Sequence, residues 1–265
     1  MATFRDLHAP GRLLILPNAW DAGSARLIED CGAAAIATTS SGVAWARGYP
    51  DGNALPPRVL AAAVGEIARV IRVPLSADVE AGYSDDPRAV ADTVTAVMNA
   101  GAVGINLEDG AGTPDLLCAK IEAVKAAAAK AGVDLFVNAR TDVFLKRLVP
   151  SERAVDETIA RAKRYRAAGC DGIFVPALAE VAAIHAIVAG VAPLPLNVMA
   201  YPGLPEAAGL RELGVRRLSA GAAIASAALG RARSRARAFL ADGRSEPLFD
   251  ESVAYGPTNA LFPRT

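Results

Sequence analysis

Hydrophobic and polar positions alternate along the chain between short apolar runs rich in β-branched residues and longer amphipathic stretches. The short runs are typical of strands buried on both faces, and the longer stretches have the apolar spacing of helices packed on a sheet. The predicted strands are residues 13–17, 34–39, 74–80, 103–108, 135–140, 172–176, 195–199 and 217–219. The predicted helices that follow them are residues 22–30, 57–71, 87–99, 114–131, 152–168, 179–189, 205–213 and 222–240.

Proline and glycine mark the ends of these helices. Proline lies in the first predicted turn at Pro57, Pro87 and Pro205, and glycine follows the last turn of several helices. Eight consecutive strand–helix units predict a (β/α)8 TIM barrel, with a doubly wound open sheet as the alternative. We expect one barrel domain over residues 1–265, whose tail, residues 244–265, is either disordered or packed on a neighbouring subunit.

Composition narrows the classes of partner. The 28 basic residues balance the 28 acidic ones, so no net field favours nucleic acid or an anionic membrane. Three widely spaced cysteines without a CxxC pair argue against a disulfide framework. No apolar run is long enough to span a bilayer, and the first residues do not resemble a signal peptide, so a cytoplasmic location is expected.

Two neighbouring predicted strands end in carboxylates. Asp78 and Glu80 close one, and Glu108 and Asp109 close the next. In parallel α/β folds these strand ends meet at one face, where ligands bind. Oxygen ligands without nearby His or Cys favour Mg²⁺ or Mn²⁺. Alternatively, Asp78 and Glu80 only rim the barrel, and Asp109 caps a helix.

Further polar residues follow the other strands. Arg140 ends a strand, where it either contacts an anionic ligand or serves as a structural partner for Glu108 or Asp142. A face with carboxylates, amides and an arginine is suited to a small carboxylate bound through a metal. The other candidates at this face are Trp20 after the first strand, Ser41 and Gly42 after the second with a long loop through Tyr49 and Asp51, and Asn197 on the seventh.

Six ordered motifs resemble the isocitrate lyase / phosphoenolpyruvate mutase superfamily over about residues 14–240. The motifs are Pro17-Asn18-Ala19-Trp20-Asp21, Thr39-Ser40-Ser41-Gly42, Gly48-Tyr49-Pro50-Asp51-Gly52, Asp78-Val79-Glu80-Ala81-Gly82-Tyr83, Glu108-Asp109 and Asn138-Ala139-Arg140. The resemblance implies a barrel whose last helix is exchanged with a neighbour, and a homotetramer built as a dimer of dimers.

The resemblance also implies a set of site residues. Mg²⁺ is expected to bind chiefly through Asp78, with Asp51, Glu80 and Glu108 acting directly or through water. Backbone groups around Ser41, Gly42 and Val43, together with Arg140, are expected to hold the 2-oxo acid part of the substrate. Trp20 and Asn197 are expected to complete the substrate site. The shared chemistry makes or consumes an enolate, which the metal and the arginine stabilise.

The chain departs from the superfamily's patterns in two places. Asp78-x-Glu80 replaces the usual Asp-x-Asp, and residues 110–114 replace the Lys-Lys-Cys-Gly-His loop of the C–C lyases. Cys118 lies in a predicted helix and is expected to be a core residue. The mutases' lysine after Glu-Asp is also missing, because Gly110 stands there.

These departures leave three functions open. We expect a Mg²⁺-dependent carbon–carbon lyase or decarboxylase that acts on a small 2-oxo or 2-hydroxy dicarboxylate through an enolate. Water or Tyr49 would return the proton. The alternatives are a phosphoenolpyruvate mutase-like P–C bond enzyme and a catalytically inactive protein that binds 2-oxo acids.

Overall fold

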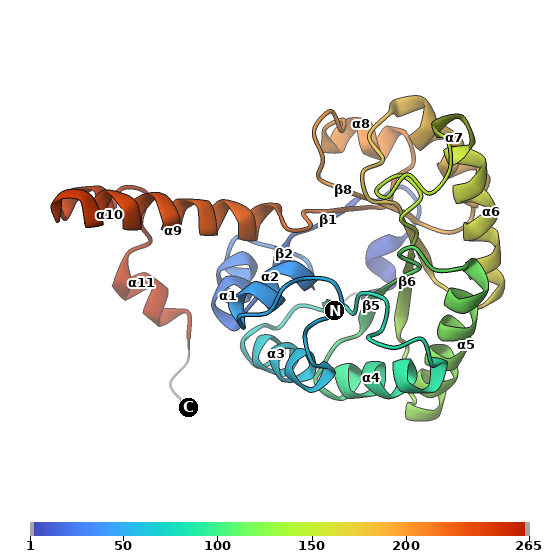
Figure 1. The fold of residues 1–265 in the computed structure, drawn as a ribbon, viewed down its shortest axis with the longest axis horizontal. Helices are drawn as coiled ribbons and strands as arrows, with labels where there is room; N and C mark the ends of the chain where they lie inside the picture. Colours follow the sequence, from blue (N-terminus) through green and yellow to red (C-terminus); the bar gives the residue numbers. More distant parts are fainter. Residues whose placement is uncertain (1–2, 263–265) are drawn as a thin grey trace.

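The computed structural model describes residues 3–262 and contains a parallel β-barrel surrounded by helices (Figure 1). The strands are β1 (Leu14–Leu16), β2 (Asn18–Ala19), β3 (Ile36–Thr38), β4 (Leu75–Asp78), β5 (Gly104–Glu108), β6 (Phe136–Arg140), β7 (Gly172–Phe174), β8 (Leu196–Met199) and β9 (Arg217–Ser219). Their order in the sheet is β1-β9-β8-β7-β6-β5-β4-β3-β2. The predicted (β/α)8 barrel is therefore confirmed.

The barrel closes through a strand that is broken in two. Pro17 separates β1, which pairs with β9, from β2, which pairs with β3. Proline has no backbone N–H to donate to a ladder, which explains the break in the single strand predicted over residues 13–17. β1 and β2 together occupy one strand position of the barrel, so the nine strands fill the eight positions of a (β/α)8 barrel.

Helices follow the strands with ends close to those predicted. They are α1 (Ala22–Asp30), α3 (Pro57–Val70), α4 (Pro87–Asn99), α5 (Pro114–Ala131), α6 (Ala154–Ala167), α7 (Val181–Val191), α8 (Ala207–Glu212) and α9 (Ala223–Asp242), with the 3-10 turn η2 (Ser151–Arg153) before α6. None of the helices within residues 3–262 is long and apolar enough to cross a membrane.

One helix corrects the prediction. Residues 40–46, expected as the start of a long loop, form α2 (Ser40–Ala46). A Cβ on Gly42 would lie 2.8 Å from Thr39 Cγ2 and 2.9 Å from Trp20 Cβ, so this helix packs closely on its neighbours. Tertiary packing thus stabilises a helix whose Ser-Ser-Gly start is typical of a turn.

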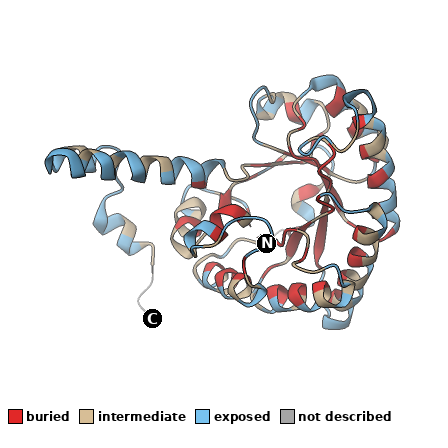
Figure 2. Ribbon diagram, viewed as in Figure 1, coloured by how far each residue is buried: buried red, intermediate tan, exposed pale blue. Residues whose placement is uncertain are grey.

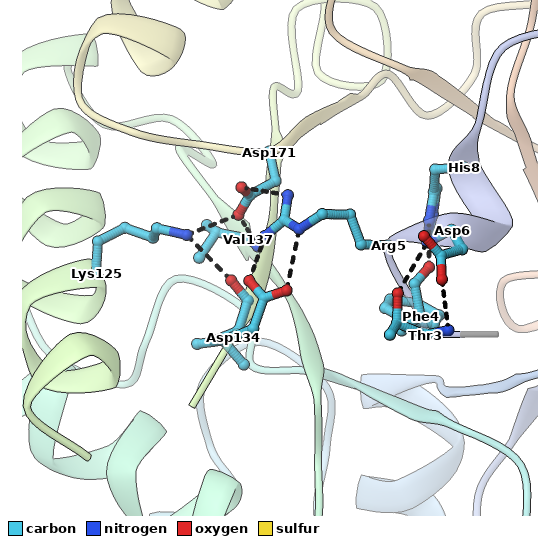
Figure 3. Close-up of polar contacts among 10 residues, drawn as sticks. Thr3, Phe4, Arg5, Asp6, His8, Lys125, Asp134, Val137 and Asp171 are labelled. Atoms are coloured by element: carbon cyan, nitrogen blue, oxygen red, sulfur yellow. Dashed lines mark hydrogen bonds and ion pairs between the residues drawn. The ribbon is translucent and has the colours of Figure 1, made fainter. Parts of the chain in front are cut away.

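The amino end of the barrel is closed by the N-terminal segment. The 3-10 turn η1 (Asp6–His8) follows Phe4, which packs with Leu14, Leu16 and Phe136 in a small apolar cluster. Arg5 donates to Asp134 at 2.6 Å and to Asp171 at 2.9 Å (Figure 3). This segment forms a plug at the amino end of the barrel.

The C-terminal helix leaves the barrel. α9 projects from the body, and the tail forms α10 (Glu246–Phe249) and α11 (Tyr255–Ala260), so described residues of the tail are helical (Figure 1). These helices are largely exposed, whereas the strands are buried (Figure 2). Near the start of α9, Ile15 on β1 is 57% exposed and lines an apolar hollow of about 850 Å³. The outer face of β1 therefore lacks a covering helix.

Candidate active site

A small cavity of about 150 Å³ lies where the strands end at the carboxyl side of the barrel. Parallel strands bring their last residues to this face, and the loops that follow them form its walls. The lining residues are Asn18, Thr39, Ser40, Ser41, Asp51, Asp78, Asn106, Arg140, Phe174, Met199, Ser219, Gly221 and Ala222. The size suits an acid of a few carbon atoms.

Two carboxylates share this cavity. Asp78 is the last residue of β4, and its backbone N–H donates to Thr38 Oγ1 at 2.8 Å. Asp51 reaches the same cavity from the loop before α3. Burial raises the pKa of Asp78, the positive charge of Arg140 opposes that shift, and the negative charge of Asp51 adds to it. The pair therefore has more negative charge than nearby side chains compensate.

Glu80 does not line the cavity. β4 ends at Asp78, and Glu80 follows in a turn with φ +50°, which departs from the strand geometry expected for Asp78-x-Glu80. Its Oε2 accepts from the backbone N–H groups of Gly52 and Asn53, and its Oε1 accepts from the Tyr83 hydroxyl at 3.0 Å. Glu80 thus anchors the loop that carries Asp51 toward Asp78.

Arg140 lines the cavity and is fixed by two carboxylates. Its Nη1 lies 2.8 Å from Glu108 Oε2, and its Nε donates to Asp142 Oδ1 at 2.7 Å. Burial acts to lower the pKa of Arg140, but Glu108, Asp142 and Asp78 outweigh it and raise that pKa. Burial raises the pKa of Glu108 to about 7, against the opposing charge of Arg140. The structure therefore contains both predicted ion pairs of Arg140 and also exposes it to a ligand.

Asp109 has a structural role of a different kind from the predicted helix cap. Its Oδ2 accepts from Tyr165 at 2.6 Å and from Arg161 at 2.9 Å, and its Oδ1 accepts from the backbone N–H of Asp142. The cap of α5 is Thr113 instead. Asp109 therefore ties the end of β5 to α6 and to the loop that carries Asp142.

The structure brings only some of the predicted substrate residues to the cavity. Ser41 lines it, while Gly42 and Val43 follow in α2, Val43 being buried in the core. Tyr49 and Trp20 pack against the core rather than line the cavity. Asn197 lies inside the barrel, where its Oδ1 accepts from Asn138 at 3.0 Å.

Several lining residues had no predicted role in binding a metal or a substrate. Asn18 Oδ1 accepts from the backbone N–H groups of Ala220 and Gly221, both at 2.9 Å, which joins the first and last strand ends. Asn106 comes from the interior of β5 and Phe174 from the end of β7. Asn18 and Phe174 lie at strand ends, which was the available signal, whereas Asn106 lies in the middle of β5 and gave none.

The sequence matches a known protein family over most of its length. The sequence profile described as phosphoenolpyruvate phosphomutase matches residues 4–240. The chain belongs to this family. The superfamily inferred from the motifs is therefore confirmed, and relatives within it carry the names of lyases, decarboxylases and mutases.

Three relatives cover most of this chain. A solved structure from Burkholderia cenocepacia, proposed to be a phosphonomutase, is 44% identical, with a TM-score of 0.84 over 88% of this chain and 97% of that chain. An uncharacterised protein of Mycobacterium tuberculosis is 38% identical over 97% of this chain and 95% of its own length. An oxaloacetate decarboxylase of Ectopseudomonas mendocina is 31% identical over 81% of this chain and 76% of its own length.

The oxygen atoms that line the cavity of this phosphomutase-family protein are suitable ligands for a hard divalent cation. Within residues 3–262, no three His, Cys, Asp or Glu side chains are grouped as a ready metal cluster. Asp51 and Asp78 nevertheless face one cavity with only oxygen-bearing and amide side chains among its polar residues, apart from Arg140. Mg²⁺ keeps several waters and commonly uses one or two carboxylates. Asp51 and Asp78, with no His or Cys among the lining residues, therefore fit Mg²⁺ better than Zn²⁺.

The loop after Glu108-Asp109 is a tight turn that differs from the superfamily's donor loop. Gly110 has φ +55°, the backbone N–H of Gly112 donates to Asp109 O at 2.7 Å, and α5 begins at Pro114. Lys146 Nζ, which pairs with Asp142 Oδ2 at 3.0 Å, would lie 3.3 Å from a Cβ on Gly110. Cys118 is half-buried in α5 and packs against the core, as predicted.

Proposed function

We propose that the protein is a Mg²⁺-dependent lyase or decarboxylase that acts on a small 2-oxo or 2-hydroxy dicarboxylate through an enolate. The observation that carries this proposal is the meeting of Asp51, Asp78 and Arg140 in one cavity of about 150 Å³. Two carboxylates suit a divalent cation, and a guanidinium beside them suits a carboxylate. The oxaloacetate decarboxylase among the relatives supports this reading.

Arg140 would bind and orient the substrate. Glu108 and Asp142 already engage Nη1 and Nε, which fixes the guanidinium plane and leaves Nη2 to donate to a carboxylate. Phe174 lies under the guanidinium, 5.7 Å from its carbon to the ring centroid, and forms an apolar wall of the cavity. A preorganised donor in a site shielded from water favours negative charge that develops during reaction.

Asp78 and Asp51 would hold Mg²⁺. Glu108 would hold Arg140 through their ion pair, and Glu80 would anchor the loop that carries Asp51. When bound, the ion supplies positive charge that offsets the charge developing on the enolate oxygen. In a decarboxylation the bond to the departing carboxyl group breaks, CO₂ leaves, and its electron pair forms the enolate. A proton from water then completes the product. Tyr49, the other predicted donor, packs on the core and needs a loop movement to take part.

A substrate panel tests this proposal. Oxaloacetate, malate derivatives, methylisocitrate and phosphonopyruvate would be incubated with and without Mg²⁺, and the products followed by proton NMR. We expect turnover of at least one dicarboxylate that stops when EDTA removes the metal. No turnover of any dicarboxylate, with Mg²⁺ or Mn²⁺, would contradict it.

A phosphonomutase is the second candidate, because the 44% identical relative is proposed to have that function. Gly110 weighs against it, since the lysine that the mutases carry there is missing. Phosphorus NMR of phosphonopyruvate conversion distinguishes the two. An inactive binding protein, the third alternative, would bind oxalate or pyruvate with Mg²⁺ in calorimetry and turn over nothing in the panel.

The exposed C-terminal helix supports assembly into a homo-oligomer. Leu229 and Phe239 on α9 and Phe249 on α10 are 52%, 45% and 71% exposed, while Ile15 lines an uncovered apolar hollow on β1. An α9 exchanged between subunits would cover such surfaces, as expected for a dimer of dimers. Light scattering should give a mass of two or four chains, and Leu229→Asp should lower it. A monomeric wild-type protein would contradict this assembly.

A further inference from the structure

Among residues 3–262, Arg217 is a buried cation without a carboxylate partner. It lies on β9 inside the barrel, is 1% exposed, and makes no ion pair within residues 3–262. Its Nε and Nη1 have no hydrogen-bond partner in the described chain. Burial lowers the pKa of Arg217 to about 9, with Asp78 the acidic group that opposes this shift. A buried, unpaired charge is destabilising, so its presence calls for a functional reason.

The other buried arginines differ in this respect. Arg140 is held by Glu108 and Asp142, and Arg161 by Asp109 and Glu157, with every pair at 2.9 Å or less. On the amino side of the barrel, the Phe4 ring of the N-terminal plug lies 6.0 Å from the guanidinium carbon of Arg217. The positive charge therefore lies between an apolar floor and the cavity that contains Asp78.

Within residues 3–262, the Arg217 guanidinium makes one hydrogen bond, which crosses the barrel to Asn106. Arg217 Nη2 donates to Asn106 Oδ1 at 3.1 Å, and Asn138 Nδ2 donates to the same oxygen at 2.9 Å. Arginine can only donate, so the atom of Asn106 that faces it must be the oxygen. The Nδ2 group of Asn106 then lies on the side of the amide that faces away from Arg217. Asn106 lines the cavity, and within the described residues its Nδ2 has no hydrogen-bond acceptor.

We propose that Arg217 is a positioning residue for anion binding, because it fixes the Asn106 amide so that Nδ2 donates to an anionic ligand in the cavity. Its charge also raises the positive potential beneath the ligand. Asn106 touches the ligand, and Arg217 acts through Asn106 and through its field. This inference rests on the proposed function, since the ligand is the carboxylate or enolate oxygen of that reaction. It assigns the site a second donor besides Arg140.

The test separates stability from ligand binding in Arg217→Met. Methionine has a similar length and no charge, so relief of the buried charge should leave Tm unchanged or raise it. Oxalate affinity, measured by calorimetry with Mg²⁺ present, should fall by about 10- to 100-fold. The affinity for Mg²⁺ alone should not fall, because a positive charge has been removed. Arg217→Lys, which keeps the charge and a donor, should recover most of the oxalate affinity.

Two further variants keep the test decisive. Arg161→Met removes a buried arginine that has partners, so it should lower Tm. Asn106→Asp gives Arg217 a carboxylate partner and removes the donor, so it should fold stably and lose oxalate binding. The inference is overturned if Arg217→Met lowers Tm as Arg161→Met does, or binds oxalate like the wild type. Failure of the wild-type protein to bind oxalate with Mg²⁺ would overturn the proposed function, and this inference with it.

Discussion

The two ends of the barrel both gather charged side chains, but they compensate those charges differently. At the amino end, Arg5 meets Asp134 and Asp171, and Lys125 meets Asp171 at 3.0 Å, so each charge has an opposite neighbour (Figure 3). At the carboxyl end, Asp51 and Asp78 face one cavity, and the arginine beside them is already paired twice. We call the amino end closed, because its charges are compensated within the protein, and the carboxyl end open, because the charges of Asp51 and Asp78 are not.

The difference separates stability from function. Closed pairs such as Arg5–Asp171 hold the plug and its strand loops in place without any ligand. Uncompensated groups such as Asp78 and Arg217 cost stability in the isolated chain, and the proposed binding of a cation and an anion would offset that cost. Barrel enzymes place chemistry at the carboxyl end, which agrees with this assignment. Substitutions at the two ends should therefore have opposite signatures.

The largest effect is expected for Asp78→Asn. Loss of the buried carboxylate should reduce Mg²⁺-dependent kcat/KM by about 10³-fold or more, because metal and developing charge lose their main partner. Tm should stay the same or rise, since burial already disfavours the charged form of Asp78. Turnover assays and calorimetric melting measure the two effects. An Asp78→Asn variant with lower Tm and full activity would mean that Asp78 stabilises the fold and takes no part in the reaction.

Asp171→Ala should give the opposite signature at the amino end. Asp171 pairs with Arg5 and Lys125 and accepts from the backbone N–H of Val137 at 2.8 Å. Both cations are partly exposed, which weakens the ion pairs, so we expect a loss of about 2 kcal/mol in the free energy of unfolding. kcat should not change. Urea titration measures the loss.

Asp134→Ala is the matched control for that substitution. Its side chain is 67% exposed and contacts Arg5 only from the surface. An exposed pair contributes about 1 kcal/mol or less. Equal losses in the two variants would show that the closed network adds nothing beyond single surface pairs.

His8 in the plug predicts a pH dependence of stability. Burial lowers the pKa of His8 to about 4, helped by the charges of Arg217 and Arg5 and opposed by the hydrogen bond to Phe4 O and by Asp171. Because the unfolded chain binds the proton near pH 6.5, stability should fall as pH drops from 6.5 toward 4, by about 2 kcal/mol at pH 5.

His8→Phe tests that assignment. The ring stacks on Phe136 at 4.2 Å between centroids, and phenylalanine can keep this contact. The variant should show less loss of stability between pH 6.5 and 5 in urea titrations. A pH profile identical to that of the wild type would assign the acid sensitivity to other groups.

The sequence predicted the barrel because local patterns encode it directly. Apolar runs such as residues 103–108 and helix punctuation such as Pro87 depend on neighbours along the chain, and the structure follows them closely. The helix α2 escaped prediction because Gly42 is helical only through its contacts with Trp20 and Thr39. Packing of distant segments leaves no periodic signal.

The candidate site was predictable only in part for the same reason. Asp78, Asp51, Ser41 and Arg140 reach the cavity because strand ends must meet there. Glu80 does not line the cavity, because β4 stops two residues earlier and Glu80 lies in a turn; the apolar pattern did not define this boundary. Arg217 and Asn106 lie in the barrel interior, where a sequence without structure predicts apolar residues.

The smallest effects are expected for alanine substitutions at two glycines with left-handed backbone conformation, one at each end of the barrel. Gly110 (φ +55°) follows Glu108-Asp109 at the open end, and Gly132 (φ +68°) ends α5 at the closed end. Alanine in this conformation costs roughly 1 kcal/mol at either position. A Cβ meets nothing within 4 Å at Gly132 but lies 3.3 Å from Lys146 Nζ at Gly110.

Gly132→Ala should therefore lose only the backbone contribution and keep full activity. Gly110→Ala should lose slightly more, because Lys146 must shift, and its activity should also stay close to that of the wild type if the Gly110 loop is a tight turn rather than a mobile donor loop. Urea titration and turnover of the two variants side by side make the comparison. A fall in kcat for Gly110→Ala, with stability equal to that of Gly132→Ala, would mean that movement of this loop takes part in the reaction, and the missing proton donor would then have to be sought there.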